Sequence, residues 1–192
     1  MSSLAAREIF AAPRSQMAEQ DIDFMKAALA AAAEASRRRD VPVGAVVVRA
    51  GEIIGTGYNC REQRQCPLGH AEIMAIQEAS QRLHSWRLEE CEIYVTLEPC
   101  LMCTGAILQA RMRRLIFACV DPKAGAVESL YRLCADQRLN HQLPVTSGVL
   151  ADESAALLAD FFAQLRTQKR DSAKNGEPAE AGQWRMTLNC TR

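Results

Sequence analysis

Two cysteines stand three positions apart directly behind a proline, in the segment PCLMC at residues 99–103. In the first turn of a helix such a pair projects to one side, so Cys100 and Cys103 can reach a single ion. The positive end of the helix dipole lies there as well and favours the thiolate, which is the form that binds metal. The pair therefore indicates a metal site, although redox dithiols, structural zinc sites and chance pairs share this spacing.

A histidine at the start of a second expected helix favours a metal site over a redox dithiol or a chance pair. The chain has three histidines, and His70 stands in the segment GHAE at residues 69–72. If both helices begin at the same edge of a sheet, His70 and the two thiolates converge. Three protein ligands with one open position are typical of catalytic zinc, whereas structural zinc sites close with four ligands. Cys66, four residues before His70, is the rival fourth ligand.

Glu72 favours the catalytic alternative. It lies two residues beyond His70, too close to be a comfortable fourth ligand but placed to reach whatever occupies the open position. Zinc lowers the pKa of bound water to roughly 7, and a neighbouring carboxylate can take that proton and deliver it onward. The order H-x-E…P-C-x-x-C is the signature of zinc nucleobase deaminases. The motifs therefore predict hydrolytic deamination.

The composition agrees with a globular enzyme of one main domain. The chain has 192 residues, 48% of them hydrophobic, and its 23 basic residues balance 23 acidic ones, so no overall field attracts nucleic acid or membrane. Eight cysteines without an export signal indicate metal binding or catalysis rather than a disulfide framework. No apolar run approaches the ~20 residues that span a bilayer, so we expect a cytoplasmic protein.

Strands and helices must alternate to position these residues, which predicts an α/β sandwich. Helices are expected over residues 21–39, 70–83, 100–110 and 153–170, with a short helical piece near Leu130. Strands are expected over residues 43–49, 52–58, 92–97 and 115–120 and around Val145. Either Asp152 or Ser154 can cap the last helix. Residues 1–20 are expected to be a flexible arm, residues 21–170 the zinc domain, and residues 171–192 a disordered tail.

Four further stretches lie outside the zinc motifs, namely VPVGAVVV, GYN, DPKAGA and LADESAALLADFF. Together with GHAEIMA and TLEPCLMCTGAIL they resemble the bacterial tRNA adenosine deaminases, over about residues 21–168. The zinc motifs are shared across the cytidine-deaminase-like superfamily, so the other stretches are what favour this branch. The resemblance implies a cytidine-deaminase-like three-layer sandwich, with a mixed five-stranded sheet flanked by helices. It also implies one zinc ion per subunit, a homodimer, and conversion of the wobble adenosine of a tRNA anticodon to inosine.

The resemblance assigns roles to individual residues. The zinc ligands and the proton carrier are His70, Cys100, Cys103 and Glu72, and the groups that bind the base are Asn59 and the N–H of Ala71. A substrate-side loop contains Asp121, Lys123 and Gly125, and the terminal helix places Phe162 and Arg166 near the RNA. Of the adjacent Phe161 and Phe162, only one can be buried. The apolar Leu101, Ile107 and Leu108 exceed what one sheet face can hide, which favours a dimer.

Two other functions stay open at this point. The protein could deaminate a free base or nucleotide, in which case activity would not need a polynucleotide. It could also be a zinc-stabilised scaffold without activity, if Cys66 closed the metal site.

Overall fold

The structure is a computed structural model that describes residues 14–174. Its helices are α1 (Arg14–Arg37), α2 (Arg61–Arg64), α3 (Ala71–Leu83), α4 (Leu101–Gln109) and α5 (Ala151–Lys174), with a short 3-10 helix η1 (Leu133–Ala135). Its strands are β1 (Gly44–Arg49), β2 (Glu52–Tyr58), β3 (Cys91–Leu97), β4 (Arg114–Cys119) and β5 (Val145–Ser147). Over the described residues no helix combines the length and the apolar character needed to span a bilayer.

The five strands form one mixed sheet in the order β2-β1-β3-β4-β5. Strand β1 pairs antiparallel with β2 and with β3, whereas β3, β4 and β5 run parallel. The start of β1 and the ends of β2, β3 and β4 therefore lie at the same edge of the sheet. Loops and helix starts at this edge can converge on one site. The predicted mixed five-stranded sheet is confirmed.

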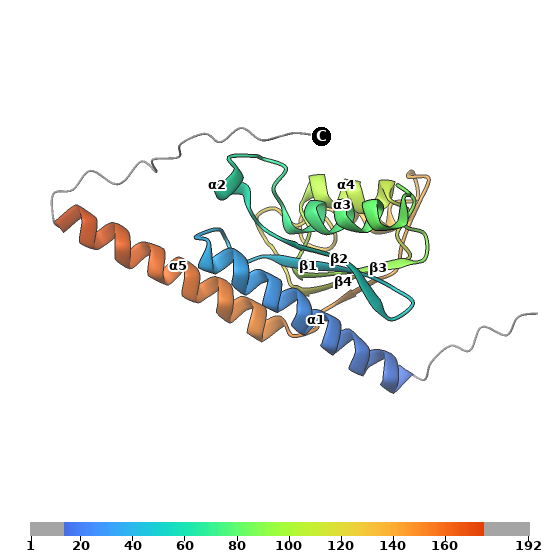
Figure 1. Cartoon of the computed structure of the whole chain (residues 1–192), viewed down its shortest axis with the longest axis horizontal. Helices are drawn as coiled ribbons and strands as arrows, with labels where there is room; N and C mark the ends of the chain where they lie inside the picture. Colours follow the sequence, from blue (N-terminus) through green and yellow to red (C-terminus); the bar gives the residue numbers. More distant parts are fainter. Residues whose placement is uncertain (1–13, 175–192) are drawn as a thin grey trace, which may run out of the picture.

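Helices cover both faces of this sheet, with α1 and α5 on one face and α3 and α4 on the other (Figure 1). Alternate strand residues serve the two faces, because successive side chains of a strand point to opposite sides. Val46 and Tyr94 pack with Met25 of α1, whereas Val47 and Phe117 belong to the core on the opposite face. With both faces buried, the strands read as apolar runs rather than as alternating patterns.

Two glycines in β2 bring α3 close to the sheet. A Cβ atom at Gly57 would lie 2.0 Å from the carbonyl oxygen of Ala71, and one at Gly55 would lie 2.3 Å from that of Ala75. No larger residue fits between the strand and the helix at these positions. The glycines therefore fix the position of the first turn of α3, which carries Ala71 and Glu72.

Both terminal helices are longer than the sequence predicts. Helix α1 begins at Arg14, so residues 14–20 are not part of a loose arm, and α5 continues to Lys174, four residues into the expected tail. Asp21, expected at the start of the helix, is a buried anchor within it, because its carboxylate accepts hydrogen bonds from Arg114 (2.6 Å) and Tyr94 (2.8 Å). Such partners lie too far away in sequence for a local pattern to reveal them. The rest of the expected arm and tail lies outside the described residues.

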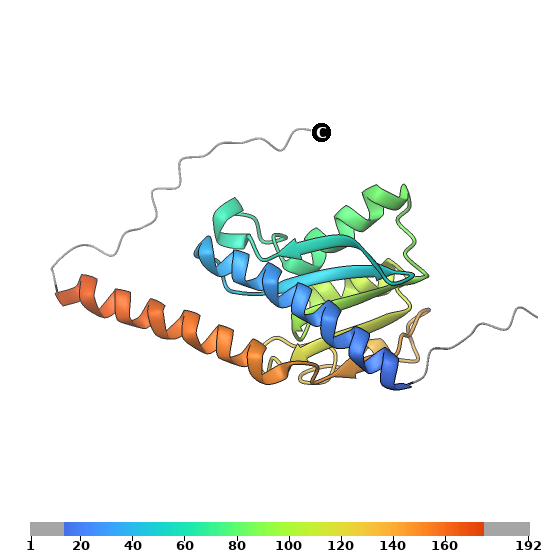
Figure 2. The same ribbon diagram turned by 60° about the horizontal axis from the view of Figure 1, so that its bottom comes forward.

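Three local predictions also need correction. Neither Asp152 nor Ser154 precedes α5: both lie within it, and the Ser154 hydroxyl donates to the Thr96 carbonyl of β3. The helical piece expected near Leu130 is the 3-10 helix at Leu133–Ala135, and α2 lies between residues 58 and 70, where no helix is expected. Helix α5 also runs past the edge of the sheet, as two views show (Figures 1 and 2).

Candidate active site

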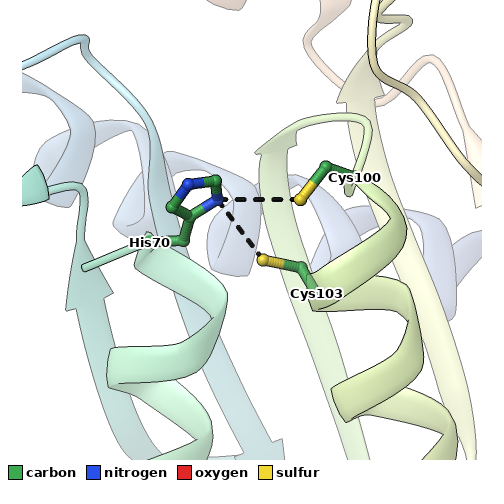
Figure 3. A group of neighbouring side chains, drawn as sticks. All are labelled: His70, Cys100 and Cys103. Carbon is green, nitrogen blue, oxygen red and sulfur yellow. Dashed lines mark hydrogen bonds between the residues drawn. The ribbon is translucent and has the colours of Figure 1, made fainter. Parts of the chain in front are cut away.

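The two cysteines and the histidine converge where two helices begin (Figure 3). His70 is the N-cap residue of α3 and Cys100 that of α4, both in extended backbone conformations, and Cys103 lies in the first turn of α4. The Nδ1 atom of His70 lies 3.7 Å from Sγ of Cys100 and 3.5 Å from Sγ of Cys103. Strand β2 leads toward His70 and strand β3 toward Cys100, so the sheet edge brings the two helix starts together.

This geometry fits a zinc ion. Tetrahedral ligands at the usual Zn–S and Zn–N distances of about 2.3 and 2.0 Å lie about 3.5 Å apart, which matches both distances to His70. The three donor atoms all lie within 4.8 Å of one another. Among the described residues no fourth ligand joins the group, whether histidine, cysteine or carboxylate, so Cys66 does not complete a four-ligand site. The donor set is that of a catalytic zinc site with one open position.

The Cys100 thiol is the group of this site that ionises most readily. Hydrogen bonds from the Cys103 thiol and from the His70 ring lower the pKa of Cys100 to about 3. The Cys103 thiol, as the donor to Cys100 and as a buried group, has its pKa raised. These hydrogen bonds favour the thiolate form of Cys100, the form that binds metal, and binding of a metal ion by thiolate and imidazole ligands releases protons.

A cavity of about 210 Å³ opens beside the metal-binding group. Its lining includes His70, Cys100 and Glu72, with Val41, Val43, Asn59, Arg61, Ala71, Leu97, Glu98, Asp121 and Ala124. The volume is smaller than the ~300–1,000 Å³ of pockets for drug-sized ligands, so one small planar group is a suitable occupant. Glu72 is only 4% exposed, and burial raises the pKa of its carboxyl group. It is therefore a buried carboxyl group in the cavity wall rather than a solvated surface charge.

Asn59 and Ala71 both line this cavity, as expected for groups that bind a base. The side-chain Nδ2 of Asn59 donates to the Val41 carbonyl at 3.1 Å, which fixes the orientation of the amide. Its Oδ1 has no protein partner among the described residues and remains available as an acceptor. The N–H of Ala71 belongs to the first turn of α3, where a helix has no acceptor of its own for backbone amides.

The other predicted substrate residues divide into two groups. Asp121 lines the cavity, and its Oδ1 accepts hydrogen bonds from the amides of Lys123 (3.0 Å) and Ala124 (3.3 Å), so it also stabilises the turn. Lys123 is exposed on the same loop outside the cavity lining. Phe162, 42% exposed, and Arg166 lie on α5 and do not line the cavity either. Phe161 is buried, so the prediction for this pair is confirmed.

Sequence reasoning missed two buried carboxylates that support the rim. The Asp40 carboxylate accepts hydrogen bonds from the backbone amides of Glu62 (2.8 Å) and Gln63 (3.0 Å). These bonds hold α2 in place, and with it the cavity residue Arg61. Glu98 accepts the backbone amides of Asp121 and of residues 127–129. Glu98 stands in the quoted TLEPC stretch, but the partners of both carboxylates lie 22 to 31 residues away, so no local pattern showed these contacts.

Comparisons with known proteins agree with this site. The cytidine and deoxycytidylate deaminase zinc-binding region matches residues 18–119. The tRNA-specific adenosine deaminase of Bacillus subtilis (strain 168) is 44% identical over 156 residues, which cover 81% of this chain and 97% of that protein.

Solved structures extend the comparison. One solved structure comes from a study of A-to-I editing by tRNA:A34 deaminases at the wobble position of transfer RNA. Its TM-score is 0.69 at 43% sequence identity, and the match covers 71% of this chain and 99% of that one. A guanine deaminase from Nitrosomonas europaea has a TM-score of 0.62 at 24% identity over 85% of this chain and all of that one, which is a likeness of fold alone. The chain thus belongs to the tRNA-specific adenosine deaminases, within the cytidine and deoxycytidylate deaminase family.

Proposed function

We propose that this protein is a zinc-dependent hydrolase that converts adenosine to inosine at the wobble position of a tRNA anticodon. The observation that carries the proposal is the convergence of His70, Cys100 and Cys103 next to a cavity of about 210 Å³, which His70, Cys100 and Glu72 help to line. The 44% identity to a tRNA-specific adenosine deaminase supports the choice of base and of substrate.

His70, Cys100 and Cys103 would hold the zinc ion, which supplies Lewis acidity and lowers the pKa of water to roughly 7. Glu72 accepts a proton from the water that adds at C6 of adenine. Its carboxyl group delivers this proton to N1 of the ring, then takes the second proton of the added water from the hydroxyl group on C6 and delivers it to the departing amine. Water is consumed, the C6–N bond breaks and ammonia leaves, so the product is inosine.

Two other residues of the cavity lining offer hydrogen bonds to the base. The free Oδ1 of Asn59 offers an acceptor, and the N–H of Ala71 a donor, for the polar edge of a purine. Val41, Val43 and Leu97 supply apolar contacts to its faces. A single-stranded anticodon loop suits such a site, because its base enters the cavity with little pairing energy to overcome. We assign Asp121, Lys123, Phe162 and Arg166 to contacts with the flanking RNA.

We further propose that the protein is a homodimer. The expected apolar excess on α4 is wrong for Ile107 and Leu108, because both are buried within the subunit. Leu101, however, is 50% exposed, and the exposed Leu130 is joined to the same region, since its amide donates to Gly125, which pairs with Cys100. An apolar patch of this kind, with Tyr131 beside it, suits burial against a second subunit. With tRNA as its substrate, the enzyme would act in the cytoplasm.

The test compares classes of substrate. The zinc-loaded protein is incubated with an anticodon stem-loop RNA containing adenosine at the wobble position, and separately with free adenosine, adenine, guanine and cytidine. We expect inosine in the RNA and little or no ammonia from the free compounds. Efficient deamination of a free base, with the RNA left unchanged, would replace this proposal with the free-base alternative.

A further inference from the structure

A buried carboxylate beside the zinc motif has no role in the chemistry described above. Glu98 stands two residues before Cys100 and is 2% exposed. Its Oε1 accepts three consecutive backbone amides, from Val127 (3.1 Å), Glu128 (2.7 Å) and Ser129 (2.9 Å). Its Oε2 accepts the Asp121 amide at 2.9 Å and the Ser129 hydroxyl. One side chain thus binds both ends of the segment from residue 121 to residue 129, called here the rim loop.

The rim loop is shaped around this carboxylate. A Cβ atom at Gly125 would lie 2.3 Å from the carboxyl carbon of Glu98, so any larger residue at the centre of the loop would have to displace this carboxylate. The backbone of Gly125 pairs with Cys100, and the Ala126 amide donates to the Pro99 carbonyl at 2.9 Å. The loop therefore folds back over the segment that leads from β3 into the metal site.

The position of the rim loop matters because part of it forms the cavity wall. Asp121 and Ala124 line the cavity, yet the described loop contains no helix or strand that could hold them in place. A buried carboxylate is costly unless its oxygens are satisfied, and here both are fully engaged by the loop. The bonds to Glu98 thus tie the cavity wall to the rigid end of β3.

We infer that Glu98 is a positioning residue, which holds the rim loop against the cavity and so sets how well the nucleotide is bound, without exchanging protons with it. The inference rests on the proposed function for its effect on activity. The effect should fall mainly on KM, because the wall that moves carries none of the three metal ligands and is separate from Glu72.

Glu98→Gln tests this directly, because the amide has one acceptor and one donor end. If the Gln oxygen keeps the three amides of residues 127–129, its NH2 group faces the Asp121 N–H, and two donors oppose each other. The Asp121 end of the loop should therefore be released. Glu128→Gln is the matched control, since it makes the same chemical change on the same loop at an exposed side chain.

Gly125→Ala provides a second variant that leaves Glu98 itself intact. The added methyl group would displace the carboxylate and should reproduce the effect of Glu98→Gln. Gly105→Ala in α4 is its control, because a Cβ atom there meets nothing within 4 Å.

Three readouts are taken for all four full-length proteins: zinc content, hydrogen exchange of the amides of residues 121–129, and steady-state kinetics with the stem-loop RNA. For Glu98→Gln and Gly125→Ala we expect one zinc per chain, faster exchange in the rim loop and kcat/KM about tenfold to a hundredfold lower, mostly through KM. The two controls should match the wild type.

Unchanged exchange in the rim loop of both test variants would overturn the inference, as would kcat/KM within twofold of the controls despite a released loop. Loss of zinc in proportion to activity would also overturn it, by showing that Glu98 supports the metal site instead. If Glu98→Gln does not fold, Gly125→Ala is judged by the same criteria. An inactive wild type would refute the proposed function alone, and hydrogen exchange would still decide whether Glu98 holds the loop.

Discussion

The proposed metal ligands are positioned by backbone geometry at two helix starts. His70 and Cys100 occupy equivalent N-cap positions, where an extended residue turns into a helix, and Cys103 follows one turn later. In such positions the helix amides and dipoles stabilise thiolate charge. The three ligands therefore depend on the local fold of α3 and α4 more than on contacts of their own side chains.

Replacing Cys103 should remove the metal. In Cys103→Ser a weak hydroxyl ligand replaces a thiolate, and only two strong protein ligands remain. We expect purified protein to retain less than about a tenth of the wild-type zinc, measured by inductively coupled plasma mass spectrometry. Cys66→Ser is the control and should keep one zinc per chain, because Cys66 is not part of the donor group. Loss of zinc in the Cys66 variant instead would revive the four-ligand structural site.

Glu72→Ala should separate catalysis from folding. Glu72 is not one of the three proposed ligands, so the protein should keep its zinc. The turnover rate should fall by at least the factor of about 10²–10⁴ that general acid–base catalysis typically contributes. The melting temperature should not fall by much, because burial already disfavours the charged carboxylate. Glu72→Gln, which keeps the volume, should be equally inactive. Turnover within a few-fold of wild type in either variant would rule out the proton-transfer role.

The convergence of His70, Cys100 and Cys103 could be predicted, because the cysteines lie within one helix turn and the histidine begins a second helix at the same sheet edge. Glu98 and Asp40 could not, since each carboxylate finds its partners in backbone amides more than 20 residues later. Arg61 was missed for the same reason, because α2 is a four-residue helix that Asp40 holds in place. Long-range polar contacts of this kind leave no periodic signal in a sequence.

At the scale of elements, the approach of α3 to β2 decides where Glu72 lies. Gly57→Ala should push the first turn of α3 away, because the new methyl group would overlap the backbone of Ala71 and Ala75. We expect a loss of about 1–3 kcal/mol or more in unfolding free energy, and lower activity. Thr56→Ala, on the opposite and exposed face of β2, should cost less than about 1 kcal/mol. Equal denaturation midpoints for the two variants would contradict this packing.

The main elements followed from apolar patterning, but their ends did not. The first helix has no sustained apolar period before Asp21, so the helical residues 14–20 gave no signal of their own. Similarly, α5 beyond Phe161 is largely exposed, and its length depends on helix propensity rather than on a buried face. Contacts between residues distant in sequence, such as the ion pair of Asp21 and Arg114, stabilise parts of the terminal helices that have no local apolar pattern.

At the scale of the whole molecule, we expect two subunits to bury the patch around Leu101 and Leu130. Leu130→Glu should shift the protein from dimer to monomer in analytical ultracentrifugation, because a charge in an apolar interface is costly. Ile22→Glu is the control, since this partly exposed residue lies on α1, on the opposite face of the sheet. If the wild-type protein were a monomer and fully active, the proposed homodimer would be wrong.

The activity proposed for this protein is the formation of inosine at one position of tRNA. The most direct measurement incubates the zinc-loaded protein with unmodified total tRNA and maps inosine by nuclease digestion and mass spectrometry. The account predicts inosine at the first anticodon position of tRNAs that carry adenosine there, and none after treatment with the Glu72→Ala protein. Absence of inosine from every tRNA, or inosine spread over other adenosines, would contradict it.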